Sequence, residues 1–277
     1  MGIPKRKLGK TGVDVTILGL GGEGILRTFG YDEDAYRMIN RAIDLGMTYF
    51  ESARAYSGSE SYYGQALGER RKEIFLTSKS HARDKHGALT FLNQTLTNMR
   101  TDYLDLWQIH DIRTNNDVEQ IFGPDGALEA FVEAKKKGLV RFIGITGHHD
   151  PNILRHCIET FDFDTVLLPV NPGEPHYKSF IDTVIPVAVA KGMGIVAMKV
   201  YFRGFATRLP WFRTMEPFLH YALSHEVSTA VIGCDSVEQL EQNVRFASSF
   251  NPMSAESMDQ HVRDVGLNAR ALLYYKP

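Results

Sequence analysis

The chain has 277 residues, of which 43% are hydrophobic and 23% are charged. These shares are typical of a globular protein, and they exclude a wholly disordered or collagen-like chain. Lysine and arginine number 31 and aspartate and glutamate 33, which gives a formal net charge of −2. A chain so close to neutral gives no electrostatic reason to expect binding to nucleic acid or to a membrane surface.

Cysteine content and the length of apolar runs indicate the compartment. Cys157 and Cys234 are too few for a disulfide framework or for a metal site made of cysteines alone. The longest clearly apolar run, 184–190, is far shorter than a membrane span, and the first residues lack the apolar core of a signal peptide. We therefore expect a cytoplasmic protein in a reducing environment, and its oligomeric state stays open.

Short apolar or β-branched runs recur along the chain, and helix-like segments separate them. One such segment begins with three acidic residues at 32–34 and continues with apolar residues on one helical face, as amphipathic helices do. Helix starts are also indicated at 150–151 and 236–238, where a capping side chain precedes proline or an acidic first turn. The eight runs are 15–20, 48–50, 74–77, 104–109, 142–145, 165–170, 195–198 and 230–232.

Strands that alternate with helices pair in parallel, because each strand needs a crossover before the next. A closed barrel of eight such units typically takes about 250 residues. An open, doubly wound sheet is the competing fold, and its nucleotide motif would open a helix after the first strand. The glycine-rich segment 19–24 stands there, but the residues after it lack helical periodicity. We therefore predict the α/β class and a (β/α)8 TIM barrel.

No linker divides the chain, so we predict one domain over residues 1–277. Two long loops, 112–126 after the fourth strand and 199–213 after the seventh, stand where barrel enzymes hold their chemistry. The aromatic residues of the second loop serve either as ordinary packing or as a wall over substrate or cofactor. The expected parts are a β-hairpin at 1–14, the barrel at 15–250 and a tail at 251–277.

Polar residues follow the predicted strands at their carboxyl ends. An ammonium beside a tyrosine stabilises the phenolate and lowers a pKa that is ordinarily about 10. A carboxylate orients the ammonium, and a histidine binds the substrate oxygen or shares the proton. This set suits protonation of a carbonyl oxygen while a cofactor delivers hydride to the carbon. In chain order the residues are Glu51, Tyr56, Lys79, His110, Thr146 and Asn171.

Each of these groups also has a plainer interpretation. Glu51 can be a structural ion-pair partner, because such pairs also perturb pKa values. Tyr56 and Lys79 can be rim residues, and a lone His110 can cap its strand through backbone bonds. The pair His148 and His149 invites a metal interpretation with His176. Adjacent histidines on an extended segment point in opposite directions, so we expect no metal.

Several segments together resemble the aldo-keto reductase family, from Lys7 to about Phe246. They are 7–12, 49–60, 76–79, 102–110 and 232–243. The resemblance implies that Tyr56 is the general acid, Lys79 its pKa partner and His110 a donor on the carbonyl side. It also implies NADP(H), with NAD(H) as the alternative, bound extended across the barrel mouth. The residues expected against the cofactor are Gly22, Glu23, Thr146, Asn171, Met198, Lys199, Arg203, Gly233, Asp235, Ser236, Gln239, Gln242 and Asn243.

Three positions depart from the family pattern. Glu51 replaces the aspartate and is one methylene longer. Leu167 stands where many members carry a glutamine that binds the carboxamide. The region of the adenosine 2′-phosphate offers Asp235 and Gln239 in place of a lysine or arginine. We expect NADPH to be the preferred cofactor by a narrow margin, and NADH to bind with a smaller loss of affinity than is usual in the family. The remaining candidate cations are Arg203, Arg208 and Arg245.

The sequence therefore predicts an NAD(P)H-dependent oxidoreductase that reduces an aldehyde or ketone. Its partner would be a small-molecule carbonyl or alcohol, with no nucleic acid and no membrane. The alternative is a dinucleotide-binding relative with weak or altered chemistry, either a regulatory subunit or a lyase-like protein. The residue that separates the two hypotheses is Glu51.

Overall fold

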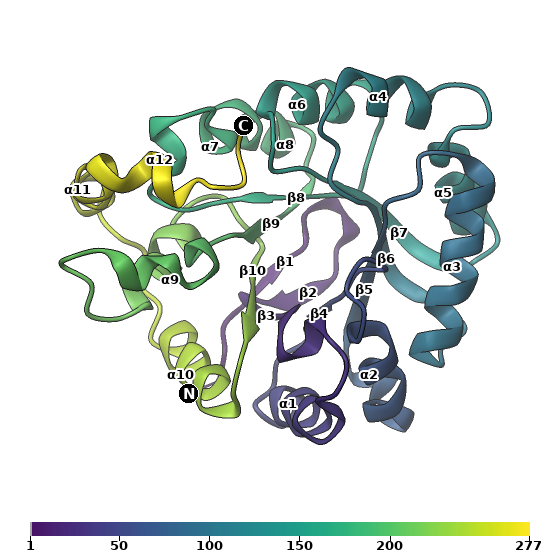
Figure 1. Cartoon of the computed structure of the whole chain (residues 1–277), viewed down its shortest axis with the longest axis horizontal. Helices are drawn as coiled ribbons and strands as arrows, with labels where there is room; N and C mark the ends of the chain where they lie inside the picture. The colour runs from purple at the N-terminus through teal and green to yellow at the C-terminus, as the bar shows by residue number, and fades with distance from the viewer. Residues whose placement is uncertain (1) are drawn as a thin grey trace.

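The computed structural model describes residues 2–277, so Met1 of the expected hairpin segment lies outside the described residues. Within them, parallel strands close into a barrel in the order β10-β3-β4-β5-β6-β7-β8-β9, with helices around it (Figure 1). This confirms the (β/α)8 prediction. The barrel strands are β3 Leu18–Gly24, β4 Tyr49–Glu51, β5 Phe75–Ser80, β6 Leu104–Ile109, β7 Val140–Thr146, β8 Thr165–Pro169, β9 Gly194–Met198 and β10 Thr229–Cys234.

The predicted N-terminal hairpin is present and is formed by β1 (Lys5–Lys7) and β2 (Asp14–Thr16). The predicted run 15–20 is therefore divided. Its first residues pair with β1, and the barrel strand β3 begins only at Leu18. Leu8 of the hairpin is fully buried in the apolar cluster that fills the barrel interior. The hairpin thus closes the end of the barrel that lies away from the carboxyl ends of the strands.

The helices form where one face is apolar and the first turn is capped. In α1 the five buried side chains all come from the face predicted by the periodicity. Asp150 accepts a hydrogen bond from the Asn152 N–H at 2.9 Å at the start of α6. The barrel helices are α1 Asp32–Asp44, α2 Ser59–Ala66, α3 Lys85–Met99, α4 Asn115–Phe122, α5 Ala127–Lys136, α6 Pro151–Thr160, α7 Phe180–Thr183, α8 Ile185–Ala190, α9 Glu216–Leu223 and α10 Val237–Ser248. No helix over residues 2–277 has the length and apolarity needed to cross a membrane.

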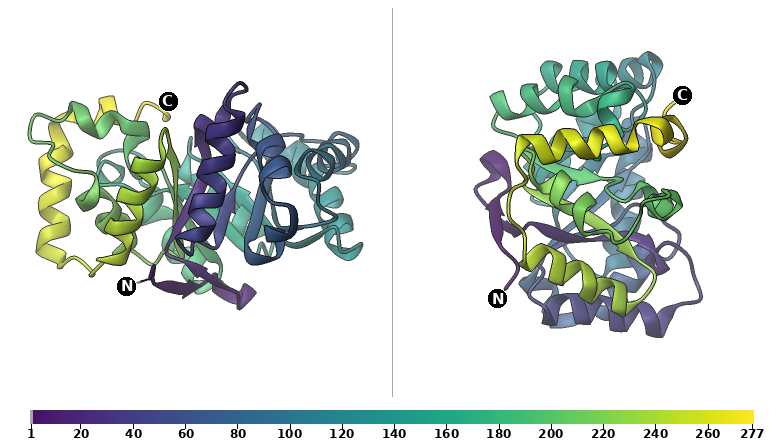
Figure 2. Two further views of the ribbon diagram at one scale, coloured as in Figure 1. Left: turned by 90° about the horizontal axis from the view of Figure 1, so that it is seen from below. Right: turned by 90° about the vertical axis from the view of Figure 1, so that its left-hand side faces the viewer.

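The two long loops and the tail are more ordered than the sequence indicates. The loop after β6 contains α4, and the loop after β9 contains a 3-10 helix, η5 (Phe202–Arg208). The tail folds into α11 (Ala255–Val265) and α12 (Ala269–Leu272). Helix α12 contacts η5, so the end of the chain packs beside the loop after β9 (Figure 2). The tail thereby reaches the face of the barrel where the strands end.

Candidate active site

The barrel brings the four predicted catalytic residues to one mouth. Glu51 ends β4, Lys79 lies near the end of β5, and His110 directly follows β6. Tyr56 lies in the loop between β4 and α2. Parallel pairing sets Glu51 opposite Thr77, two residues before Lys79, so both side chains point into the barrel.

Glu51 and Lys79 form a buried ion pair, with 3% and 1% of each residue exposed. The Lys79 ammonium also donates a hydrogen bond to the Ser52 carbonyl at 2.9 Å. The second oxygen of Glu51, Oε2, accepts a hydrogen bond from the Gly22 N–H at 2.9 Å. The longer glutamate therefore reaches the lysine and at the same time ties β4 to β3.

Tyr56 lies between Lys79 and His110. The Lys79 Nζ is 4.9 Å from the centroid of the Tyr56 ring, and the ring of His110 is 6.1 Å away and nearly perpendicular to it. Burial raises the pKa of Tyr56 above its ordinary value, and Glu23 raises it further against the opposing effect of Arg27. This direction is opposite to the expected depression by Lys79. Burial of the phenol is the largest cause of the rise.

The histidines at the mouth are held in the neutral form. Burial lowers the pKa of His110 well below its ordinary value, and the nearby Lys79 lowers it further. Burial also lowers the pKa of His148 to about 4, with Asp111 opposing the shift. The Nε2 of His148 lies 3.2 Å from an oxygen of Asp111. Within residues 2–277 the buried Nδ1 atoms of His110 and His148 have no hydrogen-bond partner.

Two cavities meet at Tyr56. The first, of about 720 Å³, extends from Tyr56 to Asn243. The second, of about 670 Å³, extends from Tyr56 to His110, His148 and Tyr275. Both volumes lie in the range of small-molecule sites. The residues that line both cavities are Glu23, Arg27, Tyr56, Leu167, Met198, Lys199 and Arg203.

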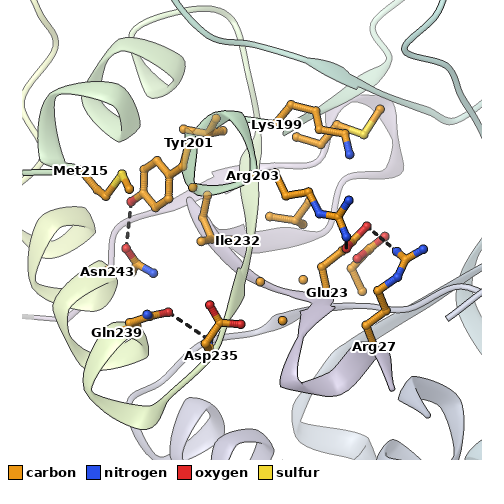
Figure 3. A pocket seen from close by; sticks show the side chains of 18 of the residues that line it. Glu23, Arg27, Lys199, Tyr201, Arg203, Met215, Ile232, Asp235, Gln239 and Asn243 are labelled. Carbon is orange, nitrogen blue, oxygen red and sulfur yellow. Dashed lines mark hydrogen bonds and ion pairs between the residues drawn. The ribbon is translucent and has the colours of Figure 1, made fainter. Parts of the chain in front are cut away.

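Most of the predicted cofactor residues line the first cavity (Figure 3). Thr146 lines the second, and its hydroxyl accepts a hydrogen bond from the Asp111 N–H at 2.9 Å. Asn171 is buried and donates hydrogen bonds to the Lys199 carbonyl and to the Tyr275 hydroxyl instead. The residues in the first cavity are Glu23, Met198, Lys199, Arg203, Gly233, Asp235, Gln239, Gln242 and Asn243.

Two further predicted cofactor residues line neither cavity. Gly22 donates its N–H to Glu51, and Ser236 caps α10 by accepting from the Gln239 N–H. A side chain at Gly22 would also approach the Glu51 carbonyl at 2.8 Å. Both residues shape the walls of the site through the backbone.

The charges in the first cavity are unevenly distributed. Glu23 pairs with Arg27 at 2.7 Å and lies 3.7 Å from Arg203. Figure 3 shows this group well apart from Asp235, whose N–H donates to Gln239 at 2.9 Å. Among the described residues, no lysine or arginine lines the cavity around Asp235 and Gln239.

Sequence reasoning missed several residues of the site. Arg27 lies in a 3-10 helix directly after β3. Asp111 follows His110, has a left-handed backbone and lines the second cavity. Tyr274 and Tyr275 come from the tail and line the second cavity. No periodicity marks these positions. The one local signal was the acidic residue Asp111, which directly follows the predicted site residue His110.

Comparison with known proteins identifies the family. The sequence profile of the Aldo/keto reductase family matches residues 17–209, more than half of the chain. The chain belongs to this family. It is similar to an L-galactose dehydrogenase of Arabidopsis thaliana, with 26% identity over 93% of this chain and 91% of the relative.

Solved structures share the fold of this chain. An aldo-keto reductase of Bacillus halodurans in its holo form has a TM-score of 0.79 and 24% identity, over 95% of this chain and 96% of that one. An aldo-keto reductase of Klebsiella pneumoniae in complex with NADPH has a TM-score of 0.77 and 19% identity, over 96% of both chains. At these identities the likeness shows the fold.

Proposed function

We propose that this aldo-keto reductase reduces an aldehyde or ketone with NAD(P)H, with Tyr56 as the general acid. The observation that carries the proposal is the position of Tyr56, which lines both cavities beside a buried Glu51–Lys79 pair. A group that protonates the substrate carbonyl must lie where the substrate cavity and the cofactor cavity meet.

The first cavity fits a dinucleotide by its volume and by its alternating polar and apolar walls. The residues that would hold it are Met198 and those of the Asp235–Asn243 segment. When bound, a reduced nicotinamide supplies a hydride to the carbonyl carbon. The Klebsiella pneumoniae structure with NADPH supports NADP(H), and the carboxylate of Asp235 supports NAD(H) as the alternative.

The chain supplies the proton and the orientation. The neutral His110 donates a ring N–H to the carbonyl oxygen and holds it near Tyr56. As the carbon–oxygen π bond breaks, the Tyr56 hydroxyl gives its proton to that oxygen, and the product is an alcohol. Lys79 stabilises the phenolate that remains, because its ammonium lies close to the ring. Glu51 holds the ammonium in place.

Substitution of Tyr56 by phenylalanine tests this role. We expect wild-type protein to oxidise NADPH or NADH when an aldehyde is added, which is followed as loss of absorbance. Tyr56→Phe removes only the hydroxyl, so turnover should fall at least about a hundredfold while the cofactor still binds in a fluorescence titration. Turnover at the wild-type rate in this variant would remove Tyr56 from the mechanism.

A second candidate function is favoured by Leu167 and Glu51, which both depart from the family pattern and both line the first cavity. In this view the protein binds the dinucleotide but has weak or altered chemistry. Glu51→Asp separates the two. A large gain in reductase activity would indicate that the wild-type site has drifted away from reduction, whereas a loss would indicate a site adapted to glutamate.

A further inference from the structure

Lys199 stands where the two cavities meet. It is the first residue after β9 and has a left-handed backbone, with φ of 57°. Its carbonyl accepts hydrogen bonds from the Asn171 side chain at 3.2 Å and from the Phe202 N–H at 2.9 Å. A lysine rarely adopts this conformation, and such residues cluster at functional sites. The backbone is therefore fixed so that the side chain enters the site.

The side chain of Lys199 is without a counter-ion. It is partly buried, and within residues 2–277 its ammonium makes no ion pair and no hydrogen bond. Arg203, a cation of the following helix η5, lies 3.7 Å from Glu23. The remaining cations of the second cavity are all paired: Arg27 with Glu23, Lys79 with Glu51, Arg83 with Asp117 and Arg113 with Asp111.

The second cavity is rich in positive charge as a whole. Six lysine or arginine side chains line it, and the carboxylates that pair with them are Glu23, Glu51, Asp111 and Asp117. A half-buried ammonium without a partner is destabilising, because it has lost part of its hydration and gained no hydrogen bond in exchange. Burial lowers the pKa of Lys199, and Glu23 opposes this shift without forming an ion pair with the ammonium. An anion that enters the cavity would supply the missing partner.

We propose that Lys199 binds an anionic group, a carboxylate or a phosphate, on the carbonyl substrate. The proposal rests on the proposed reductase function, because it places this group on the molecule that Tyr56 protonates. Lys199 and Tyr56 line both cavities together, so a carbonyl at Tyr56 brings a substituent toward the ammonium. The substrate class is then an aldehyde or ketone that carries an acid group.

The pyrophosphate of the dinucleotide is the other source of the same chemistry, since Lys199 also lines the first cavity. The position of Lys199 favours the substrate. Lys199 lines the second cavity together with His148, and His148 lines only that cavity. In Figure 3 Lys199 lies at the end of the site opposite to Asp235 and Gln239.

The test uses an aldehyde that carries a carboxylate, 4-carboxybenzaldehyde, and its neutral methyl ester, methyl 4-formylbenzoate. We expect the wild-type protein to prefer the carboxylate by at least about tenfold in kcat/KM, as one charge-assisted bond implies. This ratio should fall toward one in Lys199→Met, and it should fall in the wild type when 0.5 M NaCl is added. The matched control is Lys178→Met. Lys178 also has a left-handed backbone, but its ammonium pairs with Asp150 and it lines neither cavity.

Other outcomes overturn the proposal. A wild-type ratio near one, or an unchanged ratio in Lys199→Met, shows that the ammonium does not bind the substrate. If the ratio is unchanged but Lys199→Met binds NADPH tenfold more weakly than the wild type, the ammonium binds the pyrophosphate of the cofactor.

If neither aldehyde is reduced, the proposed function fails and the anion site is tested by binding alone. Titration calorimetry with 4-(hydroxymethyl)benzoate and its methyl ester, on protein saturated with NADP⁺, supplies this measurement. Loss of the carboxylate preference in Lys199→Met supports the anion site even then. Equal binding of the two compounds by the wild type overturns it.

Discussion

Glu51 shows how one methylene group changes the connections of a residue. Its two carboxylate oxygens are divided between the Lys79 ammonium and the Gly22 N–H. A buried carboxylate is stable only when its oxygens are satisfied, and here a backbone donor and an ammonium do this together. The backbone at Gly22 and the ammonium of Lys79 are therefore fixed by the same side chain.

Asp235 should control the choice of dinucleotide. Its carboxylate lies where the cavity has no cation, so it repels a 2′-phosphate and accepts a ribose hydroxyl. We expect Asp235→Arg to shift the ratio of the Kd values for NADPH and NADH toward NADPH by roughly tenfold to a hundredfold. Fluorescence titration of both cofactors at one salt concentration measures the ratio. Asp162→Arg is the control, because Asp162 is also exposed but lines neither cavity. An unchanged ratio in Asp235→Arg would place the 2′-position elsewhere.

The helix η5 and strand β3 are joined across the cofactor cavity. Arg203 of η5 approaches Glu23 of β3 at 3.7 Å, and both residues are partly exposed. The backbone of η5 is left-handed at Arg203 and at Gly204, so the two halves of this element meet at a kink. A weak ion pair over a kinked loop is a contact that opens readily.

We expect Arg203→Met to speed release of the cofactor. An exposed ion pair contributes less than about 1 kcal/mol, which limits the increase in the dissociation rate to roughly fivefold. Stopped-flow displacement of bound NADPH measures that rate. Arg208→Met is the control in the same helix, because Arg208 stacks on Phe205 and lines neither cavity. Equal rates for all three proteins would show that the contact does not close the site.

At the scale of elements, the strands could be predicted because each is a buried apolar run between helical segments. Glu51, Lys79 and His110 could be found because parallel strands in a barrel end on one face. The boundary between β2 and β3 could not, since residues 15–16 suit either partner. The place of Tyr275 at the site could not be predicted for another reason. Its hydrogen bond to Glu174 joins residues 101 positions apart, and no local sequence pattern encodes such a contact.

Buried neutral histidines make the stability of the whole molecule depend on pH. Burial lowers the pKa of His225 to about 4, as it does for His148. In the unfolded chain these groups take up protons near pH 6.5, while in the folded chain they do so only near pH 4. The unfolded state therefore binds more protons in this window, and the free energy of unfolding falls as the pH falls from 6.5 toward 4.

Substitution of His225 should flatten this dependence. Between pH 6.5 and pH 4, we expect the free energy of unfolding of His225→Phe to fall by about 2 kcal/mol less than that of the wild type. The phenyl ring keeps the packing against Tyr221, whose ring centroid is 4.9 Å from that of His225. Urea unfolding followed by circular dichroism at several pH values measures the slope. Parallel curves for the two proteins would show that folding does not lower the pKa of His225.

The pairing of β10 with β3 determines when the barrel is complete during synthesis. Arg6 donates hydrogen bonds to the carbonyls of Val227 and Leu223 beside that seam, and the first of these spans 221 positions. At about 5–20 residues per second, a ribosome needs roughly 10–40 s to make the intervening chain. Throughout that time β3 is an open strand edge, which is a template for pairing with another chain. The nascent protein therefore depends on protection of its first barrel strand until its last one emerges.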